Sequence, residues 1–372
     1  MSARIFNMEM NIVKAIGIFA IVAGHCGWDI FGSFIPNGSF HVALFFFISG
    51  YFFKRDIVEI GNTLKNYFLY VKKQILRWLP RFYAYHFFYG LITFLIFIIF
   101  DRKYGALPDL DNLILQPIKN IAFTLDAPLW FVYQLVVSLI VFAFILTIVK
   151  KLNKNDYVPL SIFLPMAIIG VMLANPDFTP LKSWMRVLVK TLYTPFIIYM
   201  GYLYRNKLET IIKYNTKTLL LVIIIQMLVL TFASPINMDL NRGMLHHNIA
   251  MFITPFTGTY IVIYIAKQLA PLVAAGSFID KVGRNTFHIM ANHLFIAFLI
   301  ELVIFVIDGR SFDQLPNGIL GGKLYKLNKY KYLYTILTLY TCTHIGEILN
   351  SAGKKIKEQF QHFKSIDKNF IF

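Results

Sequence analysis

Two ionisable side chains lie in an apolar stretch near the N-terminus, MNIVKAIGIFAIVAGHCG, which begins at Met10. They are Lys14 and His25, eleven residues apart. Eleven residues of α-helix return to within about 20° of the starting face and rise about 16 Å, so the two side chains share one stripe. A lysine near a helix end often only reaches toward lipid headgroups. A histidine deep in a membrane span is costly and usually functional, so we expect His25 to take part in chemistry.

Two further histidines lie in similar surroundings. His41 opens the apolar run HVALFFFISGYFF, and His293 lies in TFHIMANHLF. Asp29 follows His25 by four residues; on a continuing helix it would share the histidine's face and fix its tautomer. The alternative, a solvated carboxylate in a loop, is the one we favour. We expect the other ionisable residues within apolar runs to be buried hydrogen-bonded groups, namely His86, His288, Glu301, His344 and Glu347.

The amino-acid composition indicates whether these residues lie in water or in a membrane. Of 372 residues, 57% are hydrophobic and only 15% are charged, whereas soluble domains carry about a quarter charged residues. Apolar runs of about 20 residues are long enough to cross a bilayer as helices. The sequence therefore predicts an all-α polytopic membrane protein. Ten such runs lie near residues 10–28, 40–53, 82–100, 128–149, 157–174, 185–204, 218–234, 247–266, 286–307 and 332–349.

The positive charges indicate an orientation. With both termini in the cytoplasm, the inner segments hold roughly twice as many lysines and arginines as the outer ones, as the positive-inside rule requires. The net charge of +17 is then a topology signal facing anionic lipid, and we expect no nucleic-acid partner. The basic segment 54–81 reads as an amphipathic helix on the inner surface. The role of the basic outer loop 308–331 is left open.

We expect one transmembrane domain over residues 1–353 and a short basic cytoplasmic tail over 354–372. The first apolar run is too long for a cleavable signal peptide and should remain as a span. Cys26 and Cys342 both fall in predicted spans, so neither a disulfide nor a metal site is expected.

At these residues the chain resembles the acyltransferase-3 family of integral membrane proteins. The family's first helix typically carries an Arg, ten intervening residues and a His. Its fucose-4-O-acetylase-like branch adds a phrase similar to FHMPLFFFISGYFF, an LWFL segment and a closing IGKNTL followed by a His. The counterparts here appear in the same order, at Lys14 and His25, Phe40–Phe53, Pro128–Phe131, and Val282–Thr286 leading to His293.

The resemblance implies an enzyme that transfers an acyl group, usually acetyl from acetyl-CoA, to a hydroxyl of a glycan or lipid-linked sugar. It also implies a location in the bacterial inner membrane and acetyl-CoA as a co-substrate, with no bound cofactor. His25 falls on the family's catalytic histidine. Lys14 stands where Arg is commoner, which keeps the charge but loses the bidentate fork. Asn11 stands where an acid is often found.

The residue types suit this chemistry. Neutral His25 can take the proton of an attacking hydroxyl. The oxyanion that develops on the carbonyl oxygen needs hydrogen-bond donors, and the candidates are His41, Asn292 and His293. Because there is no GxSxG motif, we do not favour a serine acyl-enzyme. We favour direct attack of the acceptor hydroxyl on the donor thioester while both substrates are bound. An intermediate with the acetyl group on a histidine is an open alternative. We expect Lys14, Asn285 and Trp130 to bind the donor, and Asp29 and Arg186 to lie on the acceptor side.

Two other functions are open at this point. Ten spans with buried histidines also suit a transporter or flippase of glycan precursors. A scaffold or sensor in a polysaccharide-assembly complex would use the same polar groups only to hold helices together. The oligomeric state and the acceptor sugar are not predicted.

Overall fold

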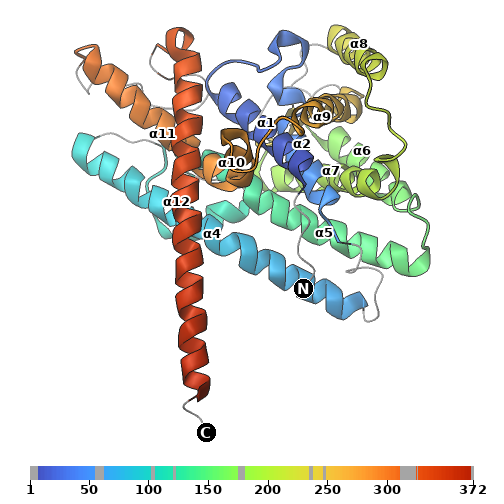
Figure 1. The fold of residues 1–372 in the computed structure, drawn as a ribbon, viewed down its shortest axis with the longest axis horizontal. Coiled ribbons are helices and arrows are strands. Elements are labelled where there is room, and N and C mark those ends of the chain that lie inside the picture. Colours follow the sequence, from blue (N-terminus) through green and yellow to red (C-terminus); the bar gives the residue numbers. More distant parts are fainter. Residues whose placement is uncertain are drawn as a thin grey trace.

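The structure is a computed structural model that describes residues 7–54, 63–101, 105–119, 123–174, 181–233, 238–245, 249–310, 324 and 326–369. Within these residues most of the chain is helical (Figure 1). Most of the predicted outer loop 308–331 lies outside the described residues.

The helices in chain order are α1 (Met8–His25), α2 (His41–Tyr51), α4 (Thr63–Phe100), α5 (Trp130–Leu152), α6 (Leu160–Leu173), α7 (Ser183–Leu203), α8 (Thr216–Phe232), α9 (Ala250–Leu269), α10 (Phe278–Arg284), α11 (Thr286–Ile307) and α12 (Leu327–Asn369). A two-stranded antiparallel hairpin, β1 (Met238–Asp239) and β2 (Met244–Leu245), lies between α8 and α9.

Five of these helices, α1, α4, α5, α9 and α11, are long and apolar enough to cross a membrane. The all-α membrane architecture is therefore supported, but the prediction of ten spans is not confirmed. The run at 40–53 folds as α2, whose 11 residues rise about 16 Å, roughly half the hydrocarbon thickness. Helices α6 and α8 are also shorter than a full span. The cytoplasmic location of both termini stays a prediction.

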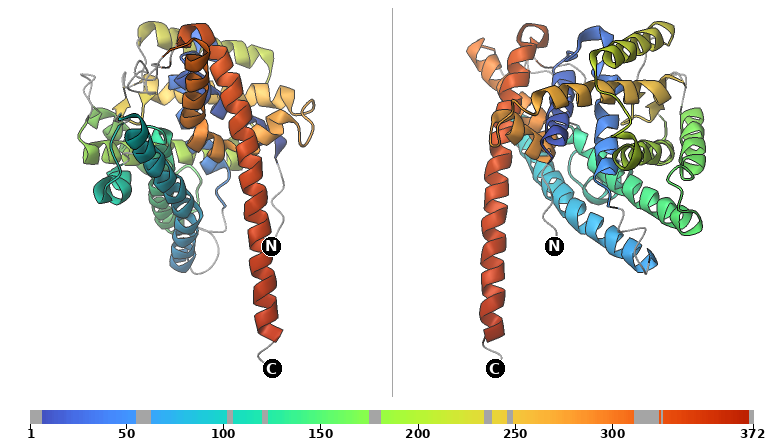
Figure 2. Two further views of the ribbon diagram at one scale, coloured as in Figure 1. Left: turned by 90° about the vertical axis from the view of Figure 1, so that its left-hand side faces the viewer. Right: turned by 45° about the vertical axis from the view of Figure 1, so that its right-hand side comes forward.

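Two helices run through boundaries that the sequence suggested. The amphipathic segment up to residue 81 and the apolar run that follows it form a single helix, α4, with Pro80 inside it. Likewise, α12 passes residue 353 without a break. Its C-terminal half projects well beyond the rest of the molecule in both views of Figure 2. The proposed tail is thus helical where it leaves the domain.

Helix α1 occupies the centre of the packing and contacts α2, α9, α10, α11 and α12. Its apolar residues are buried along most of its length, and Lys267 of α9 pairs with Glu9 in its first turn at 2.7 Å. This central position brings both ends of the stripe that holds Lys14 and His25 against other helices.

The closest helix contact joins α2 to α7. A Cβ atom at Gly50 would overlap the carbonyl oxygen of Ile198, and one at Gly201 would overlap the carbonyl oxygen of Phe47. Glycine is therefore required at both positions, because the two backbones touch where a side chain would otherwise stand. The pair fixes α2, whose first residue is His41, against α7.

Candidate functional site

His25, the last residue of α1, lies beside His293, which comes two turns into α11. Their ring centroids are 5.0 Å apart and the ring planes meet at 43°. His293 is buried, whereas His25 is partly exposed. The structure therefore brings together two residues that are 268 positions apart and that the sequence singled out separately.

The hydrogen bonds of His293 fix its tautomer. Its Nδ1 lies 3.1 Å from the carbonyl oxygen of Ile289 and 2.9 Å from that of Met290. Since a carbonyl oxygen only accepts, Nδ1 must carry the proton, which leaves Nε2 with a lone pair. This Nε2 is buried and makes no hydrogen bond within the described part of the chain. An unsatisfied buried acceptor of this kind indicates a place for a substrate proton or a ligand donor.

His41 presents the same tautomer. Its Nδ1 donates to the carbonyl oxygen of Asn37, so its Nε2 also offers a lone pair. Asn37 is buried, and its amide donates to the carbonyl oxygens of Ala20 and Trp28, each at 3.0 Å. These bonds attach the start of α2 to the end of α1 and hold His41 within electrostatic reach of His25.

This bonding pattern does not favour the predicted oxyanion donors. In their neutral forms His41 and His293 each offer an acceptor at Nε2. The side-chain amide of Asn292 donates to the Tyr85 hydroxyl at 3.1 Å and to the carbonyl oxygen of His288 at 2.6 Å. The neutral imidazoles of His41 and His293 are therefore better suited to accept a proton at Nε2 than to donate to an oxyanion, and the oxyanion donors stay a prediction.

Asp29 lies in the loop after α1, the alternative favoured from the sequence, and does not share the helical face of His25. Helix α1 ends at His25, so the helical spacing of four residues does not apply. The Asp29 carboxylate instead accepts a hydrogen bond of 2.6 Å from the backbone amide of Asn37. Asp29 thus stabilises the loop that positions His41, and a direct role on the acceptor side stays a prediction.

Lys14 lies partly buried on α1, close enough to Asp280 of α10 for electrostatic attraction. Asp280 is buried and accepts from Asn11 Nδ2 and Arg284 Nε, each at 2.8 Å, and from the Gly276 amide at 2.8 Å. Burial raises the pKa of the Asp280 carboxyl, but these hydrogen bonds and the charges of Arg284 and Lys14 outweigh it, so the pKa lies below its ordinary value. An ionised Asp280 therefore holds α10 against the N-terminal half of α1.

Asn285, predicted to bind the donor, is buried and fully used in packing. Its Nδ2 donates to the carbonyl oxygen of Lys281 at 2.8 Å, and its Oδ1 accepts from Asn350 Nδ2 at 2.7 Å. The side chain links the junction of α10 and α11 to α12. These contacts give it a structural role, and donor binding stays a prediction.

Trp130 and Arg186 both lie close to Lys190, which the sequence did not single out as a site residue. Lys190 is completely buried, and its Nζ lies 4.6 Å from the centre of the Trp130 ring. Arg186 precedes Lys190 by one turn of α7 and is within electrostatic range of it. A buried lysine against an aromatic face is a cation–π contact. The only feature of the sequence that could have singled out Lys190 is its charge inside an apolar run.

His86, expected to be a buried hydrogen-bonded group, is one. Its Nδ1 lies 2.8 Å from Asp126 Oδ2 and its Nε2 lies 2.9 Å from the carbonyl oxygen of Asn112, with His86 and Asp126 both buried. The pair connects α4 to the segment before α5 and is separate from the histidines on α1, α2 and α11.

The family model Acyl_transf_3, described as an acyltransferase domain, matches residues 7–322. The chain belongs to this acyltransferase family. The match begins just before α1 and extends beyond α11, so it includes His25, His41 and His293, while α12 follows it. Comparisons with curated proteins and with solved structures found no match. In this acyltransferase, assignment to the fucose-4-O-acetylase-like branch stays a prediction.

Proposed function

We propose that this membrane acyltransferase moves an acetyl group from cytosolic acetyl-CoA to a hydroxyl of a cell-surface glycan or lipid-linked sugar, in the bacterial inner membrane. The observation that carries the proposal is the pair of imidazoles at His25 and His293, 5.0 Å apart, with a buried Nε2 of His293 that has no partner within the described residues. Two adjacent proton acceptors suit a reaction in which a hydroxyl must lose its proton.

In the proposed reaction His25 is the general base. It takes the proton of the acceptor hydroxyl while the hydroxyl oxygen attacks the thioester carbonyl carbon. The tetrahedral intermediate then expels the CoA thiolate as the carbon–sulfur bond breaks, and the thiolate takes the proton from His25. His293 positions the sugar by accepting a hydrogen bond at Nε2 from a neighbouring hydroxyl. No acyl-enzyme is needed.

Lys14 supports a donor site at the other end of the same helix stripe. The rise of about 16 Å between Lys14 and His25 is of the same order as an extended pantetheine arm. A CoA phosphate at Lys14 would therefore place the thioester near His25. The acceptor would approach from the opposite side, past Trp130, Arg186 and Asp29.

The test is acetyl-CoA binding and hydrolysis by the purified protein. We expect His25→Ala to bind acetyl-CoA like the wild type but to lose turnover by about 10²–10⁴-fold. Lys14→Ala should weaken binding by about tenfold, because one charge pair with a phosphate is lost. His344→Ala is the matched control, since that ring packs on Tyr340 of its own helix, and it should behave as wild type.

Failure of the wild type to bind acetyl-CoA would contradict the proposed donor and would favour the alternative function, transport of glycan precursors. Retained turnover in His25→Ala would instead contradict only the role of the base. The two results can be told apart because binding and turnover are measured separately.

A further inference from the structure

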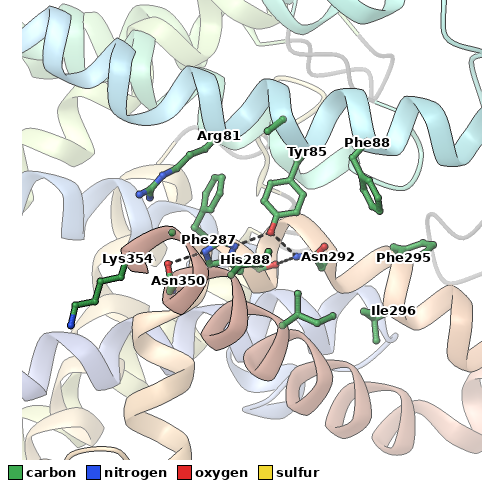
Figure 3. Close-up of a pocket in the computed structure, with 14 residues that line it drawn as sticks. Arg81, Tyr85, Phe88, Phe287, His288, Asn292, Phe295, Ile296, Asn350 and Lys354 are labelled. Atoms are coloured by element: carbon green, nitrogen blue, oxygen red, sulfur yellow. Dashed lines mark hydrogen bonds between the residues drawn. The ribbon is translucent and has the colours of Figure 1, made fainter. Parts of the chain in front are cut away.

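A cavity of about 760 Å³ lies between α4, α11 and α12, on the side of α11 that carries Asn292. Figure 3 shows the three helices around it and the side chains that point into it. The proposed reaction does not use this space, because His25 and His293 do not line it. Its polar lining residues nevertheless form an ordered arrangement.

One wall of the cavity is a continuous chain of hydrogen bonds in which every group donates to the next. His288 Nε2 must carry the ring proton, because Asn350 Oδ1 can only accept. Nδ1 of the neutral ring is then an acceptor, so the Tyr85 hydroxyl donates to it. The chain runs from Tyr89 to Asn292 (2.6 Å), to Tyr85 (3.1 Å), to His288 (2.8 Å), to Asn350 (3.2 Å) and to Asn285 (2.7 Å). These polar groups form their hydrogen bonds with one another, so few of them are left to bind a polar ligand.

The cavity has a charged end and an apolar end. Arg81, His288 and Lys354 lie toward one end, whereas Phe88, Phe295 and Ile296 lie toward the other (Figure 3). Seven residues separate Arg81 from Phe88 along α4, and seven separate His288 from Phe295 along α11, a rise of about 10 Å in each helix. Both helices therefore change from polar to apolar in the same direction.

The charged end carries excess positive charge. Arg81 is exposed and has no carboxylate within ion-pair distance among the residues that the structure describes. Lys354 is paired only loosely with Glu358, at 3.8 Å, and both of these side chains are largely exposed. Two cations at the mouth of an apolar cavity match a ligand with an anionic head and a hydrocarbon tail.

We propose that this cavity binds an anionic phospholipid of the surrounding bilayer, with its phosphate between Arg81 and Lys354 and one acyl chain along Phe88, Phe295 and Ile296. A zwitterionic lipid fits less well, because its own cation would face two others. The pantetheine arm of CoA also fits less well, because its amide groups need partners and the polar wall is already satisfied. This inference does not depend on the proposed acetyl transfer.

Native mass spectrometry of the full-length protein in a neutral detergent tests the proposal. The protein is titrated with phosphatidylglycerol and with phosphatidylcholine of identical chains. We expect wild type to bind one phosphatidylglycerol at least about tenfold more tightly than phosphatidylcholine, and the double variant Arg81→Gln/Lys354→Gln to lose that preference. His25→Ala should bind phosphatidylglycerol as wild type does.

The matched control is Lys73→Gln/Lys355→Gln. It removes two charges from exposed positions on the same two helices, outside the cavity, and should keep the preference. Ala84→Trp fills the cavity without changing charge and should also weaken phosphatidylglycerol binding. The tryptophan variant keeps the test decisive if the double variant folds poorly.

Four results would overturn the proposal. Equal binding of the two phospholipids would mean that the cavity does not recognise headgroup charge. Equal losses in the cavity and control variants would leave only non-specific charge attraction. Displacement of phosphatidylglycerol by acetyl-CoA would make the cavity a donor site. Stronger binding of a polyprenyl phosphate than of phosphatidylglycerol would make it a site for a lipid-linked substrate.

Discussion

Asp280 is the residue with the most complete set of hydrogen bonds near the predicted donor site. Asn11 and Arg284 donate to one carboxylate oxygen and the Gly276 amide donates to the other. A carboxylate accepts at both oxygens, whereas an amide can accept at only one. The negative charge at this position is therefore required by the geometry around it.

Asp280→Asn should lower the free energy of unfolding by about 1–3 kcal/mol, because its amide group must face a donor whichever way it is turned. Thermal unfolding of the detergent-purified variants measures the change. Asp239→Asn, which alters a more exposed carboxylate that pairs with Arg242 at 3.5 Å, is the control and should change stability little. Equal losses in the two variants would contradict the special role of Asp280.

The low pKa of Asp280 also predicts a pH dependence. A carboxyl group whose pKa is lower in the folded state stabilises the fold above its unfolded pKa of about 3.9, and this contribution is lost as the pH falls through the folded pKa. The stability difference between wild type and Asp280→Asn should therefore be constant above about pH 5 and shrink as the pH falls below about 4. A constant difference down to pH 3 would contradict the assignment.

Several residues of the site could be identified from the sequence, because their signal is local. The spacing of Lys14 and His25, and the positions of His41 and His293 in apolar runs, needed no knowledge of the fold. The parts played by Asp280 and Asn37 could not be found in this way. Asp280 lies 269 residues from Asn11, and Asn37 acts through backbone carbonyls that carry no sequence signature. The first span was predicted to end near residue 28, three residues beyond the end of α1 at His25.

Among the contacts between helices, the one between α2 and α7 leaves the least space for a side chain. Gly50→Ala or Gly201→Ala should each destabilise the protein by about 1–3 kcal/mol or more, since the new Cβ meets a backbone carbonyl that cannot move aside. Gly38→Ala is the control, because a Cβ there meets nothing within 4 Å. Thermal unfolding in detergent distinguishes them, and a tolerated Gly50→Ala would contradict the close approach.

The hydrogen-bond chain that joins α4, α11 and α12 gives a second prediction for the elements. Tyr85→Phe should cost about 1–3 kcal/mol, because it leaves the Asn292 amide and His288 Nδ1 without one partner each. Tyr83→Phe, two residues earlier, removes only an exposed contact of 3.5 Å to the carbonyl oxygen of Ile114. Its thermal unfolding should match wild type. If both variants unfold alike, the chain contributes nothing measurable.

The positions of the helices were largely predictable, and their lengths were not. Each apolar run corresponds to a helix, because runs of apolar residues must satisfy their backbone internally in a membrane. The run 40–53 forms α2 from His41 to Tyr51, so it begins where the run begins and is shortened at its C-terminal end, where the chain leaves the helix after Tyr51. The predicted amphipathic helix over 54–81 and the predicted span over 82–100 are one helix from Thr63 onward, because the helix continues through Pro80.

For the whole molecule, the orientation in the membrane is the property to measure. Cys26 and Cys342 are both buried, so an impermeant thiol reagent should leave the wild type almost unlabelled. From the distribution of positive charge we predict that Ser33→Cys, after α1, is labelled in intact cells. Lys154→Cys, after α5, should be labelled only once the membrane is opened. The reverse pattern would place the termini outside.

The contact of α2 with α7 also limits how the protein moves. Two backbones that touch at paired glycines cannot slide past each other by a helical turn without collision. His41 at the start of α2 and Lys190 on α7 therefore travel as one rigid body, whereas His25 and His293 belong to α1 and α11. Because Asn37 also attaches the start of α2 to the carbonyl oxygens of Ala20 and Trp28, any opening that separated His41 from His25 would first have to break these two hydrogen bonds.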